Sequence, residues 1–287
     1  MSAESSQPDV EEGTRELENL TKLKVDGVLD EGEYALAKQR VMDGQRRAAL
    51  EAAGWVFQER PVAQPVQAIG YTDLTQEICA SGMLAVDRVL DTMRGGAGAD
   101  QQAQGCAGLA ILAEKDGTRS KILAKDAVGV IVAAMTAHPT DSSVAASGCS
   151  ALGNLAIGEG ESDVRARGLR PVLAAMAAHC TSSAKVGAKG CAALANCAFS
   201  TEGEAEVVAA GGAEAIVEAM CAFPLDTKLQ EEGADALCNL TGSAAGKAAI
   251  AFAGGVAALE AVRSNVTGHP AAQRAQDCLA AINDEGT

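Results

Sequence analysis

Residues 148–156 read Gly-Cys-Ser-Ala-Leu-Gly-Asn-Leu-Ala, and variants of this stretch recur along the chain. Residues 190–198 read Gly-Cys-Ala-Ala-Leu-Ala-Asn-Cys-Ala, residues 233–241 read Gly-Ala-Asp-Ala-Leu-Cys-Asn-Leu-Thr, and residues 105–113 read Gly-Cys-Ala-Gly-Leu-Ala-Ile-Leu-Ala. A degraded copy covers residues 275–282. The copies begin 43, 42, 43 and 42 residues apart. A fixed period of this length indicates a repeat architecture, in which each repeat buries its apolar face against its neighbours.

Two further segments keep the same period. A second apolar segment precedes each copy, at residues 82–90, 127–135, 168–176, 212–220 and 255–262. A third, shorter segment precedes most of these, at residues 119–125, 163–167, 204–210 and 245–253. Proline lies just beyond three of the second segments, at positions 139, 224 and 270, where a helix ends. Asp141, Ser183 and Asp226 are candidate N-caps for the next helix. We therefore expect three helices in each repeat.

The composition favours an all-α chain. Apolar residues make up 48% of the sequence but aromatic residues only 2%, and much of the apolar fraction is alanine, which has the highest helix propensity. Without large aromatic side chains to fill wide gaps, the helices must approach one another closely. The methionines at 135, 176 and 220 recur on the second segment and are predicted to fill gaps in the core.

The order of these elements resembles the armadillo repeat family, with a short first helix, then Gly-Ala-x-x-x-[Ile/Val]-Val, then Ala-Leu-x-Asn-Leu. The resemblance covers residues 72–282, about five repeats. It implies an all-α fold, a right-handed armadillo/HEAT-like α-solenoid of three-helix repeats. Leu152, Leu194 and Leu237 should then be core contacts. The glycines that open the third helices, such as Gly148 and Gly190, should mark close helix crossings.

A separate helical hairpin is expected at residues 14–43. Leucines recur at three-residue steps from Leu17 to Leu23, Asp26-Gly27 interrupts the pattern, and Asp30 begins a second helix. This stretch resembles the SHOCT module, a small hairpin thought to mediate association. So small a hairpin has little core, so it should pack on itself, on a second chain or on the solenoid; the alternative is an appendage without function. We expect a disordered tail at residues 1–13, a linker at residues 44–71 and a C-terminal tail at residues 283–287.

The formal net charge is −15, and the acidity is spread along the chain. This argues against nucleic-acid binding and against an anionic membrane surface. A basic peptide partner is compatible with it. No apolar run is long enough for membrane insertion, and no secretory leader is visible. Nine cysteines, several at one repeat position, are typical of small buried thiols in a reducing compartment, so we expect a cytoplasmic protein, with the nucleus as the alternative.

Catalytic, metal and cofactor sites are not expected. His138 and His179 occupy the same repeat position, where a later copy has Phe223, so they are interpreted as packing residues at helix ends. Residues 242–247 read Gly-Ser-Ala-Ala-Gly-Lys, but a phosphate loop needs four residues between the glycines and a Ser or Thr after the Lys. We therefore expect no enzyme.

The asparagines are the candidate functional residues. Asn154, Asn196 and Asn239 occupy one position on three successive third helices. In armadillo proteins the third helices line a concave groove, and this asparagine pairs with the backbone of an extended peptide. An amide carries both donor and acceptor, so it suits a peptide unit whatever the ligand's side chains. The alternative is that each asparagine bonds the backbone of a neighbouring repeat and touches no ligand.

The remaining candidate lining residues lie four and seven positions before the asparagines. They are Ser150, Asp235, Lys189 and Glu232. Family members that bind nuclear-localisation segments carry Trp four positions before the asparagine; here Ser150, Ala192 and Asp235 stand there, so such cargo is not expected. The mixed lining predicts no strongly charged ligand.

The functional hypothesis is a non-enzymatic adaptor that holds an extended segment of a partner protein in its groove. Self-association through residues 14–43 would accompany it. The alternative is a structural subunit of a larger assembly that contacts its neighbours through the outer, Ala-rich surface. One solenoid architecture serves many roles, so the fold alone does not choose between them.

Overall fold

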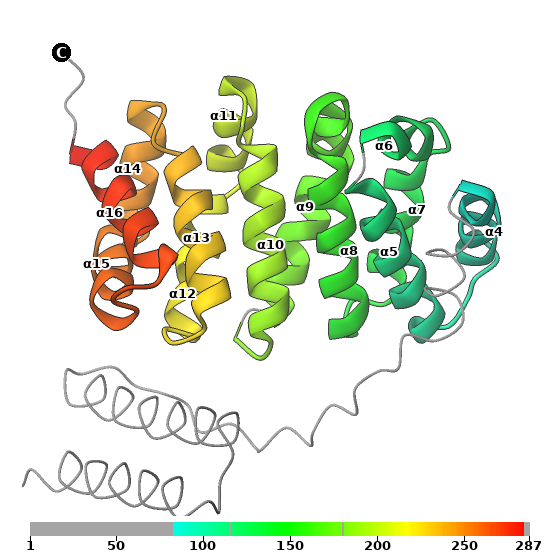
Figure 1. Ribbon diagram of the computed structural model, residues 1–287, viewed down its shortest axis with the longest axis horizontal. Helices are drawn as coiled ribbons and strands as arrows, with labels where there is room; N and C mark the ends of the chain where they lie inside the picture. The colour runs from blue at the N-terminus through cyan, green and yellow to red at the C-terminus, as the bar shows by residue number, and fades with distance from the viewer. Residues whose placement is uncertain (1–82, 115, 180, 284–287) are drawn as a thin grey trace, which may run out of the picture. The chain divides into compact units, whose positions relative to one another are not determined.

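The computed structural model describes residues 83–114, 116–179 and 181–283. The expected features at residues 1–13, 14–43 and 44–71 lie outside these ranges, and of the tail expected at residues 283–287 only Asn283 is described, as the last residue of a helix. In the described residues the chain forms thirteen α-helices, one 3-10 turn and no strand. The helices repeat in the predicted order (Figure 1). The solenoid expected from the sequence is thus confirmed over these residues.

The third helices form one layer, side by side in sequence order (Figure 1). They are α5 (Ala99–Ala113), α8 (Ser142–Leu155), α10 (Ala184–Cys197), α13 (Thr227–Asn239) and α16 (Pro270–Asn283). The second helices are α4 (Met83–Arg94), α7 (Ala127–Ala137), α12 (Gly212–Ala222) and α15 (Gly255–Asn265). Separate first helices are α6 (Asp116–Leu123), α11 (Thr201–Ala209) and α14 (Ala244–Phe252). The turn η1 (Gly158–Gly160) leads into α9 (Glu161–His179).

The prediction of separate first and second helices is wrong in one repeat. Residues 163–167 and 168–176 lie in a single 19-residue helix, α9. Before α7, α12 and α15 the residue that precedes the second helix is left-handed, with φ of 59° at Asp126, 84° at Gly211 and 81° at Gly254. The equivalent residue here is Arg167, which has no easy access to that conformation, so the helix continues through it. Arg167 instead pairs with Asp126, its counterpart one repeat earlier, at 2.5 Å.

Four of the five third helices, α5, α8, α10 and α13, cross their second helices at a glycine. A Cβ added to that glycine would lie 2.4–2.6 Å from Cγ or Sδ of a buried methionine, in the pairs Gly105–Met93, Gly148–Met135, Gly190–Met176 and Gly233–Met220. No carbon atom tolerates so short a contact, so the glycine is required for the methionine to lie across the third helix. The close crossings and the core position of the methionines are confirmed, and Met93 adds a fourth member to the series.

The predicted N-caps are also confirmed. The Asp141 carboxylate accepts hydrogen bonds from the backbone N–H groups of Ser143 and Val144 at 2.8 and 2.9 Å. The Asp226 carboxylate accepts from Leu229 N–H at 2.9 Å, and the Ser183 hydroxyl accepts from Val186 N–H at 3.4 Å. These caps satisfy donors that the first helical turn leaves unpaired and place the start of each third helix at the same repeat position.

The core runs along the stack between the three helix layers. Leu152, Leu194 and Leu237 are all buried, as predicted. Among the described helices none is by itself both long and apolar enough to cross a membrane; α14 and α15 together reach the length and apolarity but bend by 73° between them.

Candidate functional site

The three asparagines form a ladder across the third helices. Asn154 Nδ2 donates a hydrogen bond to the carbonyl oxygen of Ala110 on α5 at 2.9 Å. Asn196 Nδ2 donates to Gly153 on α8 at 2.8 Å, and Asn239 Nδ2 donates to Ala195 on α10 at 2.8 Å. Each acceptor lies one residue before the asparagine position of the preceding repeat. The asparagines therefore help to bind one repeat to the next, as the alternative interpretation of these residues expects.

The ladder leaves part of each amide available. A side-chain amide has two N–H donors and an oxygen with two lone pairs, and the inter-repeat bond uses one donor. Asn154 and Asn196 are half-buried and Asn239 is exposed. The bond also orients the amide, since Nδ2 must face the preceding helix. A second N–H and Oδ1 thus remain in a fixed direction at a repeating interval.

The other predicted lining residues lie on the same helices as the asparagines. Ser150, Lys189, Glu232 and Asp235 are all half-buried, at one or two turns from an asparagine. We define the third-helix face as the surface of α8, α10 and α13 that carries Asn154, Asn196 and Asn239. It also includes the residues four, seven and eleven positions before each asparagine. It includes three serines on α8, two lysines on α10, and one lysine and two acidic residues on α13.

The charges of α13 are engaged with each other and with α16. Lys228 Nζ lies 2.8 Å from Glu232 and 3.5 Å from Glu231, and Arg274 Nε lies 3.2 Å from Asp235. Burial raises the pKa of Asp235, and Glu232 and Glu231 raise it further, while Arg274 opposes them. Each acidic residue of this part of the third-helix face therefore has a cationic partner, Lys228 for Glu232 and Arg274 for Asp235.

Two exposed apolar side chains mark the end of the third helices where the asparagines lie. Ile157 follows α8 and is 43% exposed, and Phe199 follows α10 and is 84% exposed. They occupy the same repeat position, three residues after Asn154 and Asn196. The sequence analysis did not single them out. The signal was present in the sequence, since Phe199 is one of only four phenylalanines and stands where the next repeat has Gly242.

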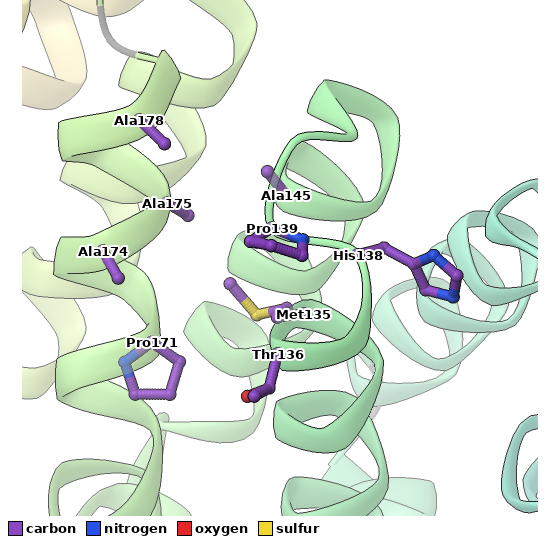
Figure 2. A pocket seen from close by; sticks show the side chains of 9 residues that line it. All are labelled: Met135, Thr136, His138, Pro139, Ala145, Pro171, Ala174, Ala175 and Ala178. Atoms are coloured by element: carbon purple, nitrogen blue, oxygen red, sulfur yellow. The ribbon is translucent and has the colours of Figure 1, made fainter.

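A separate cleft opens between the second helices. It has a volume of about 220 Å³ and is lined by Met135, Thr136, His138, Pro139, Ala145, Pro171, Ala174, Ala175 and Ala178 (Figure 2). The alanines of α9 are too short to fill the space opposite α7. In Figure 2 the His138 ring points away from the α9 residues. The lining is mainly apolar and pairs no nucleophile with a base, so the cleft offers packing surface rather than catalytic groups.

The histidine at the next repeat position is a structural residue. His179 is buried, and its Nε2 lies 2.9 Å from the carbonyl oxygen of Pro139. Phe223, at the equivalent position, is buried as well. This supports the interpretation of His179 and Phe223 as packing residues at helix ends, whereas His138 is only half-buried. In the part of the chain that the structure describes, no three His, Cys, Asp or Glu side chains gather as a metal site would require.

A carboxylate of the protein, that of Glu204, already occupies the glycine-rich turn before α14. The Glu204 carboxylate accepts hydrogen bonds from Ser243 N–H at 2.8 Å and from the Ser243 hydroxyl at 2.6 Å. A Cβ on Gly246 would lie 2.6 Å from the same carboxylate. The positive end of the helix dipole is thus compensated by a buried glutamate from the preceding repeat, in the place where a phosphate would have to bind.

Comparison with known proteins identifies the fold. No protein-family model and no curated protein matches the chain. Two engineered proteins of the Northeast Structural Genomics Consortium, targets OR329 and OR366, are each 24% identical to it, with TM-scores of 0.58 and 0.59. The first alignment covers 84% of this chain and 91% of the OR329 protein, and the second covers 93% of this chain and 98% of the OR366 protein. A designed armadillo repeat protein in complex with the peptide (KR)4 is 18% identical, covers 85% and 94%, and has a TM-score of 0.60. The chain has an armadillo-like α-solenoid fold.

Proposed function

We propose that this solenoid is a non-enzymatic scaffold that binds an extended segment of a partner protein along the third-helix face. Asn154, Asn196 and Asn239 contact the backbone of the segment. The observation that carries the proposal is that each amide is fixed by one hydrogen bond to the preceding repeat and keeps a donor and an acceptor beyond it.

The spacing of the ladder suits an extended chain. Packed helices lie about 8–10 Å apart, and an extended chain rises about 3.3 Å per residue. Successive asparagines would therefore meet every second or third residue of a segment that runs along the stack. Because the amides are already oriented by the inter-repeat bonds, binding costs little of their conformational entropy.

The comparisons support this proposal at the level of the fold. The designed armadillo repeat protein that shares it was solved with a bound peptide. Repeat scaffolds of this type are typically binding proteins. The finer assignment to the three asparagines rests on the geometry of this chain.

The direct test is selection from a random peptide library on the full-length chain, followed by affinity measurements on an Asn154/Asn196/Asn239→Ala variant. We expect selected peptides to lose about ten-fold or more in affinity, which corresponds to about 1.4 kcal/mol or more. Methylation of alternate backbone nitrogens of the peptide should weaken binding in the same way, because it removes N–H groups that donate hydrogen bonds to the asparagine Oδ1 atoms. Asn283→Ala, at an exposed residue on α16, serves as the control.

Stability has to be measured alongside affinity. Each substitution also removes an inter-repeat hydrogen bond, worth about 0.5–1.5 kcal/mol. Ala192→Tyr avoids this difficulty, since it adds bulk one turn before Asn196 and leaves the ladder in place. Equal affinity of the selected peptides for the native chain, a folded triple variant and Ala192→Tyr would show that the asparagines are structural only.

A cytoplasmic setting and self-association through residues 14–43 belong to the same proposal. Buried third-helix thiols such as Cys106 and Cys149 support a reducing compartment. Sedimentation of the full chain and of a Leu20→Asp/Leu23→Asp variant tests the association. Identical monomeric behaviour of the two would contradict it.

A further inference from the structure

Two lysines on α10 have no partner to neutralise them. Lys185 is exposed and Lys189 half-buried, one turn apart on the third-helix face. Within the described ranges neither forms an ion pair or a side-chain hydrogen bond. Like charges four residues apart on a helix repel each other, and Lys185 lies in the first turn, where the helix dipole disfavours a cation. Although the chain has 38 acidic residues, none of those in the described ranges pairs with either lysine.

The helices on either side do not supply the missing anion. On α8 the equivalent positions are Ser143 and Ser147, which are uncharged. On α13 the nearest acidic residue of the face, Glu232, is paired with Lys228 at 2.8 Å. The middle of the third-helix face is therefore a local region of positive potential on an acidic protein.

The opposite end of α10 is apolar. Phe199 is 84% exposed, and Ile157 lies at the equivalent position one repeat earlier. Exposed aromatic side chains next to oriented polar groups are typical of binding surfaces. Aromatic residues make up only 2% of the sequence and contribute little to the packing of this protein. An exposed phenylalanine at this position therefore leaves in contact with water apolar surface that could have been buried.

These groups form a gradient across the width of the face. Along α10 the order is Lys185, Lys189, Asn196 and then Phe199. At 1.5 Å per helical residue, Lys189 lies about 10 Å along the axis from Asn196, and Phe199 follows just beyond the other end of the helix, three residues after Asn196. A segment that crosses α10 at Asn196 has cations along one edge and an apolar ridge along the other.

We infer that the partner segment alternates acidic and apolar side chains where it crosses α8 and α10. Successive side chains of an extended chain point to opposite sides, so carboxylates on one side meet Lys185 and Lys189 while apolar side chains on the other meet Ile157 and Phe199. This inference rests on the proposed peptide-binding function and names the chemistry of its ligand. It differs from the sequence prediction, in which the mixed lining indicated no strongly charged ligand.

The test compares three labelled octapeptides by fluorescence anisotropy on the full-length protein: alternating Glu and Leu, alternating Lys and Leu, and the same Glu and Leu residues in two blocks. We expect the alternating acidic peptide to bind about ten-fold more tightly than either of the others, and salt to weaken it. Lys185→Glu/Lys189→Glu should abolish this preference or reverse it in favour of the Lys and Leu peptide. Phe199→Ala should reduce affinity about five-fold without changing the charge preference.

Matched controls lie elsewhere on the chain. Lys121→Glu changes an exposed lysine on α6, and Phe252→Ala removes a phenylalanine that is 88% exposed on α14; neither should alter binding. If the peptides selected from the random library depend on the asparagines but show no acidic and apolar alternation, and Lys185→Glu/Lys189→Glu binds them normally, this inference is wrong and the peptide-binding function stands. If no selected peptide depends on the asparagines, the proposed function itself fails.

Discussion

The third-helix cysteines differ sharply in their acidity. Cys106 and Cys149 are fully buried, and burial raises the pKa of each to about 12. Cys238 on α13 is half-exposed, and a hydrogen bond from the Cys278 thiol on α16 stabilises its thiolate and lowers its pKa to about 7, although partial burial opposes this. Cys278, as the donor, has its pKa raised in turn. One thiol beside Asn239 is therefore a nucleophile near neutral pH.

This predicts a site-specific pH dependence of alkylation. Because a lowered pKa keeps the thiolate at lower pH, the rate at which iodoacetamide modifies Cys238 should rise through about pH 7 instead of about pH 9. Peptide-level mass spectrometry separates Cys238 from the buried thiols, which should not react in the folded protein. Cys278→Ala removes the donor and should shift the midpoint upward. An unchanged midpoint would show that the two thiols do not interact.

At the scale of the helices, single residues decide where elements end and how closely they cross. Gly211 and Gly254 provide left-handed residues that separate first from second helices, whereas Arg167 lets α9 run through. A glycine in the middle of α5, α8, α10 and α13 allows a methionine of the second helix to lie across it. The helices themselves are ordinary, and their boundaries and contacts depend on residues without a side chain.

Gly190→Ala should therefore destabilise the fold although it raises helix propensity. The added Cβ would lie 2.4 Å from Met176 Cγ, in the middle of a buried side chain, and overpacking of this kind costs about 1–3 kcal/mol. Urea unfolding followed by circular dichroism measures the loss. Met176→Ala in the same chain should recover part of it.

Gly117→Ala is the matched control for this substitution. Gly117 also lies in a helix, α6, but a Cβ there meets nothing within 4 Å. It should leave stability unchanged or raise it by up to about 1 kcal/mol. Equal effects of the two substitutions would contradict the close crossing of α9 and α10.

For the molecule as a whole, stability is shared between neighbouring repeats. Core leucines recur in every third helix. The asparagine ladder bonds each of α8, α10 and α13 to the preceding third helix. A glutamate of one repeat accepts a hydrogen bond from the backbone at the start of the first helix of the next repeat. Such an array has only nearest-neighbour contacts, so a defect in the centre separates the two halves. The same contacts hold the third-helix face at a regular spacing, which a peptide ligand needs.

Leu194→Arg should unfold the solenoid. Leu194 is 1% exposed at the centre of the array, and loss of a buried leucine alone costs about 2–5 kcal/mol, to which the burial of an unpaired guanidinium adds. We expect a loss of helicity and of the cooperative thermal transition. Ala280→Arg, at an exposed position of α16, should leave both unchanged. A soluble Leu194→Arg variant with native thermal stability would contradict this repeat register.

The repeat, the three-helix pattern, the N-caps and the core leucines could all be read from the sequence. Each depends on local propensity and on a period of about 43 residues, and neighbouring copies reinforce the signal. The face that carries Asn154, Asn196 and Asn239 could also be predicted, because residues at one repeat position must lie on one side of the stack.

Only the tertiary structure decided how these residues are used. Four features depend on which groups other helices bring within a few ångströms. They are the bond from each asparagine to the preceding repeat, the continuous α9, the exposure of Phe199 and, among the described residues, the lack of an ion pair at Lys185 and Lys189. Those partners lie about 40 residues away, as with Asn196 and Gly153, and no local pattern specifies them. The sequence determined the repeat and its faces, while packing between repeats determined which polar groups are satisfied and which remain free to bind.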